Sequence, residues 1–152
     1  MSEESIDKPG AAFWVIAIAF ALWNLIGLMF YYQQSTLTPE TMQELGLTPQ
    51  QIAHIVNTPA WGHSGYAIAV NAGLLGAILL LIRKTWAIPL FVISLLGALV
   101  QDLDAFVLRD AMEVWSTPNA AFPPYALPLF VIAICVFEIW YARSAKAKRW
   151  LS

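Results

Sequence analysis

The side chains best suited to chemistry gather around two apolar stretches of the sequence. They combine an imidazole, a hydroxyl, an amide and a carboxylate with aromatic rings, at similar depth if both stretches are helical. Such a set suits a polyol, a sugar or a small cation, and it equally suits a water-filled mouth without a ligand. The candidate polar site comprises His63, Ser64, Gln101, Asp104, Trp61 and Tyr66, with Tyr31 and Trp115 at its rim.

Asp104 falls on the small and polar face of its predicted helix, so we expect it to point inward. Asp102 falls on the nearly opposite side, where we expect a rim charge. A buried carboxylate needs a hydrogen-bond donor. We expect His63 to be that donor, with Arg109 as the second choice.

Two short motifs resemble catalytic ones, but neither predicts an enzyme. The string 62–65 contains the Gly-x-Ser-Gly of rhomboid-type proteases, yet the only other histidine, His54, falls in a polar loop and offers no clear base. Asp102-x-Asp104 resembles the acidic motif of glycosyltransferases, without a nucleotide-binding domain. Cys135 has no partner, and no spacing predicts a metal or cofactor. We expect no catalytic residues.

Polar residues also occur deep inside the apolar stretches. We expect a midplane layer in which one interhelical hydrogen bond is worth roughly 0.6 to 2 kcal/mol, with substrate binding as the alternative role. This layer comprises Asn24, Asn71 and Ser94. Glu138 lies about one turn inside an apolar boundary and needs a cation or water, with proton handling as an alternative. Its candidate partners are Arg83, Lys84 and Lys8.

The composition decides the class of protein. Of 152 residues, 59% are apolar and 12% charged, and the net charge is −2. A soluble domain carries roughly a quarter charged residues. The apolar content excludes a disordered chain, and the single cysteine excludes a disulfide scaffold. The net charge excludes a nucleic-acid partner. We predict an all-α polytopic membrane protein, a bundle of four transmembrane helices in a lipid bilayer.

Four stretches have the roughly 20 apolar residues that a spanning helix needs. They cover about 13–32, 60–82, 86–106 and 125–142 of a transmembrane domain at 13–142. The flanking tails are 1–12 and the basic segment 143–152, which we expect to anchor the topology and contact anionic lipid. Seven of the eight Lys and Arg residues lie on the side of both tails, so both termini should be cytoplasmic.

The loop 33–59 is too polar to span a membrane. Thr-Pro pairs at 38–39, 48–49 and 58–59 are typical helix starts, with Thr as N-cap and Pro in the first turn. Gln51 has capping-box spacing from Thr48, and Gly46 is placed to end a helix. We predict short outer-surface helices at 38–46 and 48–57, and a second outer connection at 107–124.

A stripe of small residues on the second span predicts close helix packing. It comprises Gly62, Gly65, Ala69, Ala72, Gly73 and Gly76. The stripe can pack inside the bundle, or it can bind a second copy or another membrane protein. The second possibility, together with the missing catalytic set, favours a non-enzymatic accessory subunit or small homo-oligomer.

The segments 22–27, 31–34, 59–61 and 80–83 resemble small four-span bacterial inner-membrane proteins often labelled "sugar transporter". The resemblance covers roughly residues 13–110. It implies a bacterial inner membrane and, as the alternative function, a small-solute transporter or binding protein with a polar mouth facing the periplasm. Gly62-His63-Ser64 departs from the small apolar residues expected there.

Overall fold

A computed structural model describes residues 7–152, and within them every regular element is helical. Residues 1–6 of the expected N-terminal tail lie outside the described part. Four helices are long and apolar enough to cross a membrane, which confirms the predicted fold class. They are α1 (Ala11–Thr36), α4 (Ala60–Leu81), α5 (Ala87–Asp102) with its π-helical continuation η1 (Leu103–Leu108), and α7 (Ala126–Ala147).

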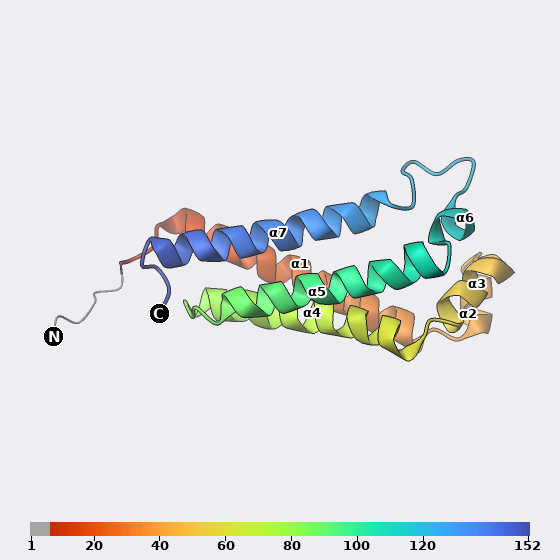
Figure 1. Ribbon diagram of the computed structural model, residues 1–152, viewed down its shortest axis with the longest axis horizontal. Coiled ribbons are helices and arrows are strands. Elements are labelled where there is room, and N and C mark those ends of the chain that lie inside the picture. The colour runs from red at the N-terminus through yellow and green to blue at the C-terminus, as the bar shows by residue number, and fades with distance from the viewer. Residues whose placement is uncertain (1–6) are drawn as a thin grey trace.

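The long helices run along the long axis of the molecule (Figure 1). The end with both described chain ends and the tight α4–α5 turn is called the terminal end. The opposite end, called the loop end, carries α2 (Pro39–Glu44), α3 (Pro49–Val56) and α6 (Ala111–Trp115). Helices α4 and α5 pack most closely, with α1 against α4 and α7 against α5.

Glycine allows the close approach of α4 and α5. A Cβ built on Gly97 would lie 2.7 Å from the carbonyl oxygen of Gly65 and 2.7 Å from the backbone nitrogen of Ala69. Backbone atoms cannot move aside as a side-chain tip can. Small residues at such crossings let membrane helices gain van der Waals contact along their length.

The small-residue stripe is therefore used inside the chain. Every member is buried. Gly65 faces α5, Gly73 faces Asn24 of α1 and Ser94 of α5, and Gly76 faces Phe91. Of the two alternatives, packing inside the bundle is confirmed, and this face is not free for a second copy or another protein because α1 and α5 occupy it.

The two predicted short helices are present as α2 and α3. The hydroxyl of Thr38 accepts from the N–H of Thr41, and Thr48 and Gln51 form both bonds of a capping box. The third Thr-Pro pair behaves differently. The Thr58 hydroxyl donates back to the carbonyl of His54 and caps no helix, so that N-cap prediction is wrong.

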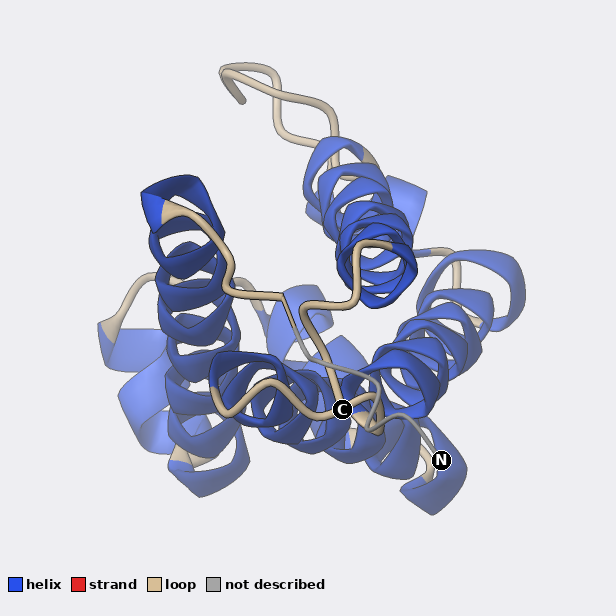
Figure 2. Cartoon of the chain, turned by 90° about the vertical axis from the view of Figure 1, so that its left-hand side faces the viewer, coloured by secondary structure: helices blue, strands red, loops and turns tan. Residues whose placement is uncertain are grey.

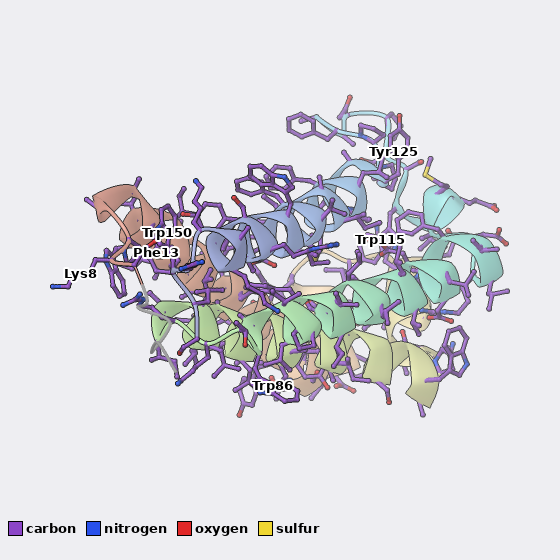
Figure 3. All side chains as sticks on the ribbon, turned by 60° about the vertical axis from the view of Figure 1, so that its left-hand side comes forward. Lys8, Phe13, Trp86, Trp115, Tyr125 and Trp150 are labelled. Atoms are coloured by element: carbon purple, nitrogen blue, oxygen red, sulfur yellow. The ribbon has the colours of Figure 1, made fainter. Side chains whose placement is uncertain are left out.

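The segment after α7 folds back onto the bundle. Arg149 has a φ of 57° and ends α7 in a Schellman motif, with the Trp150 N–H bonded to Ala145 O. Leu151 is then buried in the apolar core, and the Trp150 and Phe13 rings lie 5.7 Å apart (Figure 3). The last residues are thus packed against protein, while the basic side chains of Arg143, Lys146, Lys148 and Arg149 stay exposed, so their contact with anionic lipid stays a prediction.

Arg83 holds this segment in place. It also has a positive φ, 61°, at the end of α4. Its guanidinium donates to the carbonyls of Trp150 at 2.7 Å and Asp7 at 2.6 Å, so both ends of the described chain join the α4–α5 turn. The end-on view shows the two chain segments converging there (Figure 2).

Candidate functional site

A polar cavity of about 150 Å³ opens at the loop end, between the long helices and the short ones. Six helical elements (α1, α3, α4, α5, η1 and α6) and the turn after η1 contribute to it, so no single helix carries the site. Its polar lining comprises Gln34, His54, His63, Gln101, Asp104 and Arg109, and aromatic walls come from Tyr66, Phe106 and Trp115.

An ion pair forms the floor of this cavity. Arg109 Nε and Nη2 both donate to Asp104 Oδ2, at 2.9 and 2.5 Å. The Asp104 side chain is 2% exposed and that of Arg109 is 20% exposed. Arg109 Nη1 also donates to the carbonyl of His54, which ties η1 to α3.

The second carboxylate oxygen of Asp104 is available to the cavity. Oδ1 accepts no hydrogen bond from residues 7–152, yet it is not among the fully buried atoms without a partner. Asp104 lines the cavity, so this oxygen can accept a hydrogen bond from a solute there.

The π-helical turn explains why Arg109 reaches Asp104. A π-helix closes its hydrogen bonds between residues five apart, so side chains at i and i+5 lie on one side. Asp104 and Arg109 have this spacing. The inward direction of Asp104 agrees with our expectation. His63, expected as its first donor, is not bonded to it, and the second choice, Arg109, is.

Gly62 gives the carboxylate its space on α4. A Cβ at this position would lie 2.7 Å from Asp104 Oδ2, so any side chain would displace the ion pair. On the other side, the His54 ring meets Trp115 edge to face at 6.3 Å. Burial and then the Arg109 charge lower the pKa of His54, so the ring is neutral at pH 7.

The structure brings four of the six predicted site residues to the cavity: His63, Tyr66, Gln101 and Asp104. Trp61 and Ser64 do not line it. Trp61 is 44% exposed, and the exposed Ser64 hydroxyl donates to Ala60 O of its own helix at 2.8 Å. Both lie on the outer face of α4, because the adjacent Gly62 and Gly65 face inward.

His54 and Gln34 also line the cavity, although neither is among the predicted site residues. His54 reaches the cavity because α3 folds over the bundle mouth, and its apolar residues are the signal for that docking. Gln34 reaches it because α1 continues past the predicted end of the span, to Thr36.

The predicted midplane layer is only partly correct. Asn24 and Ser94 are buried and meet at Gly73. Asn71 is exposed and donates to Ala67 O of its own helix, because it lies on the opposite face of α4. Glu138 takes its place, accepting at Oε1 from Asn24 Nδ2 at 2.5 Å.

None of the cations expected beside Glu138 is its partner. Arg83 binds backbone carbonyls at the terminal end, Lys84 donates to Ser152 at 3.4 Å, and Lys8 is exposed. Glu138 lies near the middle of α7 rather than one turn from its end, beyond the reach of these side chains.

The fold and the cavity define a class: a four-helix membrane bundle with a polar cavity closed by short helices at one end. Comparison of the chain with protein-family models, with curated proteins and with solved structures finds no match.

Proposed function

We propose that the protein is a non-enzymatic membrane component that binds a small polar solute at the loop end. The observation that carries the proposal is the cavity whose floor is the Asp104–Arg109 pair. Gln34, His63 and Gln101 face it, and their side chains have no hydrogen-bond partner within the described residues. These groups offer donors and acceptors to hydroxyls or amides.

The volume limits the size of the solute. A water molecule occupies about 30 Å³ of liquid, so a cavity of about 150 Å³ holds a compact solute of a few heavy atoms or a small cluster of waters. The resemblance to proteins labelled "sugar transporter" makes polyols and small sugars the first solutes to test. A larger sugar would require α3 to move.

Binding is favoured over transport by a single copy. Directly below the cavity, Gly65 and Gly97 bring the α4 and α5 backbones into contact. Below that level lie the buried polar side chains of Asn24, Ser94 and Glu138, and then the apolar core of the terminal half. A solute path through one bundle would have to separate these helices. Transport, the alternative function, would therefore use an oligomer or an accessory role beside another membrane protein.

A thermal-shift screen in mild detergent tests the proposal. A ligand at 100 times its Kd stabilises the folded state by about 2.7 kcal/mol. We expect a polyol or small sugar to raise the Tm of the wild type, and the shift to disappear in His63→Ala and Gln101→Ala. Ser64→Ala is the matched control, since its hydroxyl bonds to its own helix outside the cavity.

An equal shift in all variants would place the binding elsewhere. No shift with any polyol, sugar, amino acid or small cation would make the cavity a structural mouth. Mass measurement of the purified protein separates the remaining assemblies: a native partner supports an accessory subunit, and a homodimer supports the oligomer.

We further propose a bacterial inner-membrane location with both termini in the cytoplasm. Seven of eight basic residues support this orientation, since positive residues concentrate on the cytoplasmic side. A membrane-impermeant thiol reagent applied to intact cells should label cysteines placed at 40 or 113 and spare one at 146. The native Cys135 is buried and gives little background. Labelling of a cysteine at 146 would show that the termini face the outside, which contradicts the proposed orientation.

A further inference from the structure

The centre of the bundle contains a carboxyl group without a counter-ion. Glu138 is 1% exposed and lies near the middle of α7. Its Oε1 accepts from Asn24, and its Oε2 is fully buried without any hydrogen-bond partner. Within residues 7–152, the ion pair that the structure contains is Arg109 with Asp104, at the loop end.

The amide of Asn24 has a defined orientation. Its Nδ2 donates to the carbonyl of Phe20 at 2.9 Å, and a backbone carbonyl can only accept. The second N–H of the same group then donates to Glu138 Oε1. Oε1 is thus the acceptor oxygen of the carboxyl group, and a proton on this group belongs on Oε2.

The groups around Glu138 supply no positive charge. Cys135 and Tyr141 lie one turn away on α7, and Asp102 is partly buried on α5. On the other helices, α1 presents Asn24, α5 presents Ser94, and α4 presents Gly73. The Ser94 hydroxyl already donates to Ala69 O at 2.6 Å. An ionised Glu138 would therefore leave a charge on Oε2 with neither donor nor cation.

We propose that Glu138 and Asn24 form a reversible proton-binding site at the centre of the bundle. The ligand is a single proton held on Oε2, and the neutral acid is the resting form. Charged side chains inside membrane helices are costly and mark ion or proton sites when they persist. A metal cation is disfavoured, because Asn24 presents an N–H to the carboxyl group rather than an oxygen.

The packing of α1 against α7 offers a way for the proton to exchange. These helices meet through aromatic side chains, including Phe20 with Phe137 at 5.5 Å and Trp23 with Phe130 at 5.5 Å. Such contacts leave the two backbones farther apart than the glycine contacts of α4 and α5. We place the exchange of the proton on Oε2 at a transient opening of this α1–α7 contact that admits water. The site does not depend on solute binding at the loop end.

Infrared spectroscopy of the protein in lipid bilayers tests the proposal. We expect a protonated carboxylic acid carbonyl band at neutral pH that is absent from Glu138→Gln. The band should shift when the sample is moved into heavy water, because the proton exchanges. In Asn24→Leu the band should move to higher frequency, since the carbonyl loses its donor.

Asn71→Leu is the matched control, because Asn71 bonds to its own helix on the exposed face and should leave the band unchanged. A carboxylate band for Glu138 at neutral pH would overturn the proposal. A protonated band that never responds to heavy water would show a trapped proton and would overturn reversibility. If the carbonyl band of Asn24→Leu had the same frequency as that of the wild type, Asn24 would not be the donor to Glu138.

Discussion

At the residue scale, the loop-end cavity depends on how Asp104 is neutralised. Arg109 places two donors on one carboxylate oxygen and a third on the His54 carbonyl. Arg109 is therefore both the counter-ion of the cavity floor and the link to α3. Removing either partner has unequal consequences, because only Asp104 is deeply buried.

We expect Arg109→Ala to destabilise the fold more than Asp104→Ala does. Arg109→Ala leaves the buried carboxylate of Asp104 unpaired, which costs about 3 kcal/mol at a fully buried pair. The cost is somewhat smaller here, because Arg109 is partly exposed. The double variant should lose less than the sum of the single losses, the sign of direct coupling. Denaturant titration in detergent measures these free energies of unfolding.

The same cycle with His63→Ala and Asp104→Ala should be additive, since the structure shows no bond between them. Strong coupling to His63 and none to Arg109 would contradict the observed geometry.

His54 makes a small contribution to stability that is lost on acidification. Burial and the Arg109 charge lower its pKa from 6.5, so the folded state binds fewer protons than the unfolded state just below that pH. The contribution is complete above pH 6.5 and is lost as the pH falls toward the folded-state pKa. We expect less than about 1 kcal/mol, because the ring is partly exposed.

The free energy of unfolding, measured against pH, should decline less on acidification in His54→Gln than in the wild type. Parallel curves for the two proteins would show that another group carries the dependence.

At the element scale, the α4–α5 hairpin depends on backbone contact. We expect Gly97→Ala to lower the free energy of unfolding by roughly 2 kcal/mol or more, because its Cβ would meet backbone atoms at 2.7 Å. Gly27→Ala is the matched control. Its Cβ would meet a side-chain atom of Val70 at an ordinary 3.5 Å.

Alanine favours a helix over glycine by about 1 kcal/mol, so Gly27→Ala should be neutral or stabilising. Thermal unfolding in detergent checks the pair. Equal stability of the two variants would mean that α4 and α5 separate more readily than their contact indicates.

At the scale of the whole molecule, the terminal end joins segments far apart in sequence. Arg83 connects the α4–α5 turn to carbonyls of Asp7 and Trp150, and Leu151 is buried behind that contact. We expect a cysteine placed at position 151 to react slowly with a thiol reagent. The reaction should accelerate at least several-fold when Arg83→Ala is added, because two hydrogen bonds are lost.

Lys84→Ala serves as the control, since its 3.4 Å contact with Ser152 is long. Fast labelling at 151 with Arg83 intact would show that this segment does not stay packed.

Apolar stretches of spanning length, alternating with polar loops, were enough to predict four membrane helices. Local capping chemistry was enough to predict α2 and α3, because Thr, Pro and Gln act within one turn of each other. Helical periodicity placed Asp104 inward beside Gln101, and similar depth along the predicted helices grouped His63 and Tyr66 with them. These features depend on neighbours along the chain.

Only the tertiary structure decided which distant groups meet. The π-helical turn paired Asp104 with Arg109 instead of His63, and the rotation of α4 turned Asn71 and Ser64 outward. From the sequence, the stripe of small residues could pack inside the bundle or bind a partner, and in the structure it packs against α1 and α5. Glu138 accepts a hydrogen bond from Asn24 because α7 and α1 bring these two side chains together at the same depth. Such contacts depend on helix rotation and crossing, which a single sequence does not encode locally.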